Sequence, residues 1–107
     1  MALLAMCMPI LPGKMEKWQG MMDHIKSTPD FAASRKEAGV HERSFVQNTP
    51  AGDFLIITLE GDDPAASWAK ITQSMPPEFA EFALDVHGLD VSSPPPPMPT
   101  LVLDTEA

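Results

Sequence analysis

His87 has the side chain and the position best suited to proton transfer in this sequence. It follows Phe82 and Val86 on an apolar helical stripe, and helical geometry puts it at the edge of the core beside Gly88. An imidazole titrates near neutral pH, so it can act as a general acid or base, or ligate a metal. At the end of a helix it can instead cap the helix or make a structural hydrogen bond. Both interpretations stay open.

Glu42 and Arg43 open a predicted strand together with His41. Strand alternation puts His41 and Arg43 on one face, and Glu42 with Ser44 on the other. A guanidinium directed into a ligand cavity would hold a carboxylate or enolate oxygen through a bidentate fork. Charges at a strand end can also simply be solvated or pair with each other. We therefore predict His87 as the proton-transfer residue, with Arg43 or Glu42 assisting it.

An apolar ligand pocket is predicted from Trp18, Met22, Phe45 and Trp68. The two tryptophans and Met22 lie on the inward stripes of predicted helices, and Phe45 lies on a predicted strand. Aromatic and methionine side chains suit a hydrophobic chamber, but they fill ordinary cores equally well. The alternative is therefore a core with no open space.

Composition excludes several classes of function. The chain has 107 residues, with 7 Lys and Arg against 15 Asp and Glu, giving a net charge of −8. This charge repels phosphate backbones and anionic membranes, so we expect no nucleic-acid or membrane partner. The sequence contains no phosphate-binding glycine loop, no paired cysteines, no G-x-S-x-G motif and no tyrosine. We expect no cofactor, with haem ligated by His87 or His41 as a further alternative.

The first ten residues are apolar and carry no Lys or Arg. They are too short to span a bilayer, and we interpret them as a strand, with a signal peptide as the alternative. Because the run 2–8 does not alternate, we expect a central strand covered on both faces, which would bury Cys7 as an inert thiol. A single cysteine forms no internal disulfide, so the expected location is the cytoplasm.

The chain is expected to form one domain, residues 1–91, followed by a Pro-rich extended arm, residues 92–107. The predicted elements are a strand at 2–8, a helix from 12–14 onward, a helix at 29–37 capped by Thr28, a hairpin at 43–60 with its turn at 49–53, and helices beginning at Pro64 and Pro77. Leu101, Val102 and Leu103 would let the arm pair with a sheet edge or a neighbouring subunit.

This order predicts an α+β, ferredoxin-like βαββα fold with an antiparallel sheet and helices on one face. In the third strand Phe54 and Ile56 alternate with Leu55 and Ile57, so both faces are apolar. One face can pack against the helices. The chain is too short to cover the other, so we expect a homodimer through the sheet face, with arms that can exchange.

Three motifs add a family resemblance: T-P-A-G-D at 49–53, L-E-G-D-D-P at 59–64, and V-H-G-L-D at 86–90 followed by prolines. With the element order, they make the chain from 6 to 104 similar to the dimeric α/β-barrel superfamily, and within it to a set of short bacterial proteins. The superfamily includes monooxygenases, polyketide cyclases, muconolactone isomerases and haem enzymes. The resemblance implies a barrel-shaped dimer that binds a small apolar organic molecule in its lumen. The implied activity is an isomerase, cyclase or monooxygenase type without a nucleotide cofactor, and the alternative is a non-catalytic binding or structural dimer.

Overall fold

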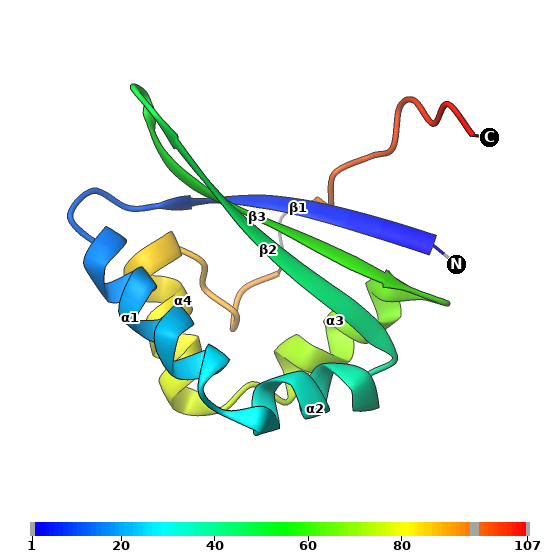
Figure 1. Cartoon of the computed structure of the whole chain (residues 1–107), viewed down its shortest axis with the longest axis horizontal. Helices are drawn as coiled ribbons and strands as arrows, with labels where there is room; N and C mark the ends of the chain where they lie inside the picture. The colour runs from blue at the N-terminus through cyan, green and yellow to red at the C-terminus, as the bar shows by residue number, and fades with distance from the viewer. Residues whose placement is uncertain (1, 95–96, 107) are drawn as a thin grey trace.

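The computed structural model describes residues 2–94 and 97–106, so Met1, Ala107 and two prolines of the predicted arm lie outside the described residues. Its elements are β1 (Ala2–Ile10), α1 (Met15–Lys26), α2 (Pro29–Glu37), β2 (Val40–Thr49), β3 (Gly52–Gly61), α3 (Pro64–Gln73) and α4 (Pro77–His87) (Figure 1). The fold is α+β, with a three-stranded antiparallel sheet. The predicted elements are therefore confirmed, and the bounds of α2 agree residue for residue.

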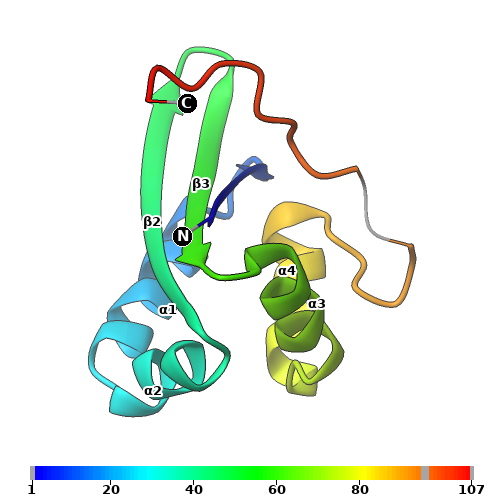
Figure 2. The ribbon, with the colours of Figure 1, turned by 90° about the vertical axis from the view of Figure 1, so that its right-hand side faces the viewer.

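The four helices lie on one face of the sheet, as the sequence predicts (Figures 1 and 2). Figure 2 shows them as two pairs, with α1 and α2 under one side of the sheet and α3 and α4 under the other. Proline occupies the first turn of α2, α3 and α4, where its missing N–H group breaks no hydrogen bond. The Asp63 carboxylate caps α3 by accepting from the Ala66 N–H group at 3.2 Å.

Thr28 stands at the N-cap position of α2 but does not cap it with its side chain. Its hydroxyl donates instead to the carbonyl of His24, in the last turn of α1, at 2.9 Å. Since α1 and α2 are almost continuous in the chain, the carbonyls left over at the end of α1 compete for this hydroxyl. The predicted helix start is correct, and the predicted hydrogen bond is wrong.

β3 occupies the centre of the sheet, between β1 and β2. The prediction of a central first strand is therefore wrong, because β1 forms an edge. Alternate residues of β1 are exposed, and Cys7 is one of them, so the predicted burial of its thiol is wrong as well. An apolar run in the sequence indicates a strand but does not show which strands lie beside it in the sheet, because those strands come from distant segments of the chain.

The core lies between the sheet and the helices. Leu55, Ile57 and Leu59 project from β3 into this space, and Trp18 and Val86 meet them from α1 and α4. The two helix pairs are tied near the surface by Asp85 of α4, which forms ion pairs with Lys14 at 2.8 Å and Lys17 at 2.5 Å. These two ammonium groups lower the pKa of Asp85 from 3.8 to about 2.

The other face of the sheet carries no helix (Figure 1). Cys7, Ile56 and Phe45 form one row across its three strands. Met98 of the arm packs against the core, and the end of the described chain lies on the open side of the sheet (Figure 1). Residues 97–106 form no strand. Their predicted pairing with an edge is absent within the described chain, and pairing with a second subunit stays a prediction. None of the helices within the described ranges is long and apolar enough to cross a membrane.

Candidate functional site

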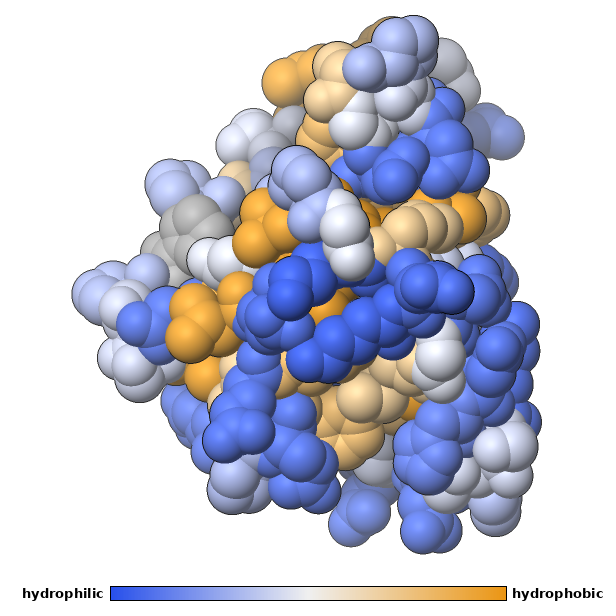
Figure 3. Space-filling model, turned by 90° about the vertical axis from the view of Figure 1, so that its left-hand side faces the viewer, coloured by the Kyte–Doolittle hydropathy of each residue, from blue (hydrophilic) through white to orange (hydrophobic). Residues whose placement is uncertain are grey.

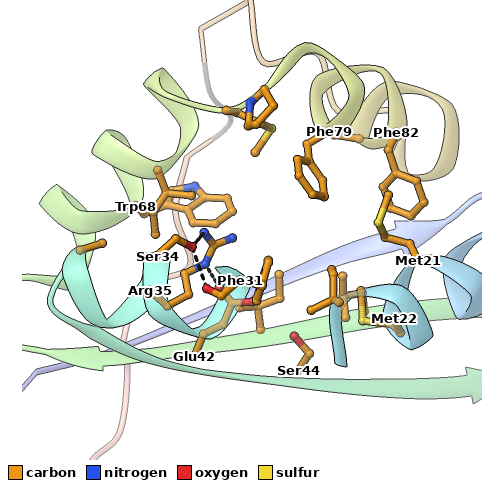
Figure 4. Close-up of a pocket in the computed structure, with 18 of the residues that line it drawn as sticks. Met21, Met22, Phe31, Ser34, Arg35, Glu42, Ser44, Trp68, Phe79 and Phe82 are labelled. Carbon is orange, nitrogen blue, oxygen red and sulfur yellow. Dashed lines mark hydrogen bonds and ion pairs between the residues drawn. The ribbon is translucent and has the colours of Figure 1, made fainter. Parts of the chain in front are cut away.

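A cavity of about 810 Å³ lies between the helix-covered face of the sheet and the two pairs of helices. Most of its lining residues are apolar, and the aromatic and methionine side chains among them include Met21, Met22, Phe31, Trp68, Phe79 and Phe82 (Figure 4). The cavity exists because α1 with α2 and α3 with α4 pack against opposite sides of the sheet (Figure 2). On one side of the molecule, apolar residues are also exposed between hydrophilic ones (Figure 3).

Arg35 and Glu42 form an ion pair in the wall of this cavity (Figure 4). Arg35 comes from α2 and donates from Nε to Glu42 Oε1, on β2, at 2.7 Å. Only 18% of the Arg35 side chain and 10% of the Glu42 side chain are exposed. The guanidinium carbon lies 4.2 Å from the centre of the Phe31 ring, and Nη1 donates to the Ser34 hydroxyl at 3.3 Å. These contacts hold the guanidinium in one orientation.

Arg35 was not among the residues predicted for the site. The available signal was its spacing: Phe31 and Arg35 are four residues apart, so they share one face of a helix. Strand alternation predicted that Glu42 and Ser44 share one face of their strand, and both line the cavity on the helix-covered side of the sheet. Only the turn between α2 and β2 brings the two charges together.

His87 lies at the end of α4 with 8% of its surface exposed, and it also lines the cavity. Its Nδ1 is 2.7 Å from the carbonyl oxygen of Pro9 on β1. Since a carbonyl only accepts, Nδ1 carries the proton in this contact and Nε2 is left as an acceptor. Burial lowers the pKa of His87, and the hydrogen bond to Pro9 opposes that shift.

The helix-capping interpretation of His87 is therefore replaced by a specific structural hydrogen bond. Gly88 ends α4 in the left-handed conformation, with φ of 68°, and its N–H group bonds the Leu84 carbonyl. The imidazole bonds a carbonyl of β1 instead of the last carbonyls of its own helix. The predicted position, at the edge of the core beside the bend, is confirmed.

The predicted site residues do not all share one face of the sheet. Glu42 and His87 line the cavity, as do three predicted pocket residues, Trp18, Met22 and Trp68. Arg43 and Phe45 lie on the opposite face, because β2 alternates, and neither lines the cavity. Arg43 Nη1 approaches Glu60 Oε1 at 3.5 Å there. The grouping of Arg43 with His87, and of Phe45 with the tryptophans, is therefore wrong.

Trp18 contributes a buried nitrogen with no acceptor. The residue is 5% exposed and lines the cavity, and its Nε1 makes no hydrogen bond within the described residues. An unsatisfied buried donor costs about 1–3 kcal/mol. Such donors are rare in folded proteins.

Comparisons of the chain with protein-family models, with curated proteins and with solved structures each find no match. The site must therefore be interpreted from its own residues. Among residues 2–94 and 97–106, no three His, Cys, Asp or Glu side chains gather in a group that could hold a metal ion.

Proposed function

We propose that this protein binds a small, largely apolar organic molecule in the cavity between its sheet and its helices. The observation that carries the proposal is the cavity itself, with its aromatic and methionine walls and a volume of about 810 Å³. Ligand pockets in proteins span roughly 300–1,000 Å³ and combine apolar walls with a few fixed polar groups. The Arg35–Glu42 pair and His87 supply those polar groups here.

A proton-transfer reaction on the bound molecule is the catalytic form of this proposal. His87 supports it, because Pro9 fixes the protonated nitrogen and leaves Nε2 able to accept a proton. Burial keeps the imidazole neutral near pH 7, which is the form required of a base. Glu42 lines the same cavity and is a further ionisable group in its wall. The reaction would be of an isomerase or cyclase type without a nucleotide cofactor.

We also propose that the open face of the sheet is covered by a second copy of the chain. Leu3 and Phe45 are exposed there, and the row of Cys7, Ile56 and Phe45 crosses all three strands. A dimer with the two sheets face to face would remove this apolar surface from water. In such a barrel the ligand cavity of each subunit lies on the outer, helix-covered side of its sheet.

Binding in the cavity can be tested with N-phenyl-1-naphthylamine, a neutral probe that becomes fluorescent in apolar surroundings. We expect the wild type to bind it and Ser44→Trp to bind it poorly, since Ser44 lines the cavity and an indole there would fill it. Gln73→Trp is the matched control, because Gln73 is exposed on α3 outside the cavity. Equal fluorescence with all three proteins, or none with the wild type, would contradict the proposal.

A further inference from the structure

We infer that the natural ligand is an organic acid, with its apolar body in the aromatic part of the cavity and its carboxylate on Arg35. This inference rests on the proposed binding function and assigns the class of ligand. It starts from the hydrogen-bond donors of Arg35. A guanidinium carries five N–H donors, and within the described residues only Nε and Nη1 have acceptors, Glu42 and Ser34. Three N–H donors are left for a ligand.

The guanidinium is held ready for such a ligand. Phe31 lies against its carbon at 4.2 Å, and Glu42 holds Nε at 2.7 Å. A guanidinium group whose orientation is fixed before the ligand arrives loses little conformational entropy on binding, and this raises the affinity. Glu42 contacts Nε, so the terminal nitrogens of the fork retain free donors. A planar carboxylate accepts from such nitrogens through two parallel hydrogen bonds.

The cavity walls limit the rest of the ligand. They are mostly apolar, so the body of the ligand is apolar. Asp30 and Glu37 line the cavity in addition to Glu42, and the chain carries a net charge of −8. These charges oppose a doubly charged phosphate more strongly than a single carboxylate. The N–H group of Trp18 is a further donor in the same wall, without an acceptor among the described residues. A carboxylate oxygen can accept from such a donor, whereas an ammonium group cannot.

Three probes of one shape distinguish the possibilities: 2-naphthoate, 2-naphthamide and 2-naphthylmethylammonium. Titration calorimetry on the purified full chain gives the dissociation constant of each. We expect 2-naphthoate to bind about tenfold more tightly than 2-naphthamide, the usual difference between a charge-assisted and a neutral hydrogen bond. Equal affinity for acid and amide, or tightest binding of the ammonium probe, would overturn the inference while leaving the binding function standing. If none of the three binds, the proposed function fails as well.

Arg35→Met tests whether Arg35 is responsible, because methionine keeps much of the apolar stem and removes the charge. We expect the preference for the acid over the amide to disappear in this variant while the amide still binds. Since the substitution leaves Glu42 without its partner, Arg35→Met combined with Glu42→Gln provides a second form that removes both charges. Lys36→Met is the control, because Lys36 is exposed on the same helix and does not line the cavity. An acid preference that persists in both Arg35 variants would assign the carboxylate to another group.

Discussion

His87 and Trp18 each bring a nitrogen into the core, and the two nitrogens differ in how they are satisfied. His87 Nδ1 meets the carbonyl of Pro9, which β1 places at the end of α4. Trp18 Nε1 meets no acceptor within the described chain. Both residues also line the cavity. Each makes a specific prediction about stability.

The stability of the protein is expected to fall as the pH is lowered from 7.5 to 5.5. Burial lowers the pKa of His87 in the folded state, whereas the unfolded chain titrates near 6.5. Below pH 6.5, His87 therefore binds a proton more readily in the unfolded state than in the folded state. The free energy of unfolding decreases as a result. In His87→Asn the amide still donates to Pro9 but does not titrate, so its curve should be flatter. Urea unfolding at several pH values measures this, and equal slopes would contradict the assignment.

Trp18→Phe is expected to leave the free energy of unfolding within about 1 kcal/mol of the wild type. The smaller ring loses some packing, but it also removes a buried donor whose cost is about 1–3 kcal/mol. Trp18→Ala is the reference, with an expected loss of about 3–5 kcal/mol from the cavity it opens. Chemical denaturation followed by circular dichroism compares the three proteins. A loss in Trp18→Phe of more than half that in Trp18→Ala would show that the indole N–H has a partner.

The end of β3 meets the start of β2 at a point of close backbone approach. Gly61 pairs with Val40, and a Cβ atom on Gly61 would lie 2.4 Å from the backbone oxygen of Gly39. Gly39 lies in the turn between α2 and β2, the two elements that carry Arg35 and Glu42.

Gly61→Ala is expected to destabilise the protein by about 1–3 kcal/mol, because the neighbouring atom is backbone and has little freedom to move. Gly20→Ala is the matched control. Gly20 lies inside α1 with no atom within 4 Å of an added Cβ, and alanine there should stabilise the helix by about 0.5–1 kcal/mol. Thermal unfolding of both variants gives the comparison. A melting temperature for Gly61→Ala at or above that of the wild type would mean that the two strand ends separate easily.

For the whole molecule, the main prediction concerns its oligomeric state. If the open face of the sheet joins two copies, Phe45→Glu should convert a dimer to a monomer, because it places a charge in the apolar row that the second copy would cover. Leu84→Glu is the control, since both side chains are 54% exposed but Leu84 lies on α4. Light scattering coupled to gel filtration measures the mass. A monomeric wild type at micromolar concentration would contradict the proposed dimer. The cavity would still be a site within a single chain.

Local patterns predicted the elements well because their causes are local. Prolines after Thr28, Asp63 and Pro76 mark three helix starts, and Gly88 marks a helix end. The faces of β2 followed from alternation alone. The place of β1 in the sheet could not be predicted in this way, because an apolar strand has the same sequence pattern whether it lies at the edge or at the centre of a sheet.

The site shows the same division between local and tertiary causes. The sequence alone determined that His87 ends a helix at the core and that Glu42 lies on the face of its strand opposite Arg43, since helical and strand periodicity fix which residues share a side. Only the tertiary structure decided that Pro9 holds the imidazole, that Arg35 pairs with Glu42, and that the cavity lies on the helix side of the sheet. These contacts join segments whose meeting depends on the packing of whole elements, and periodicity within one element carries no information about that packing.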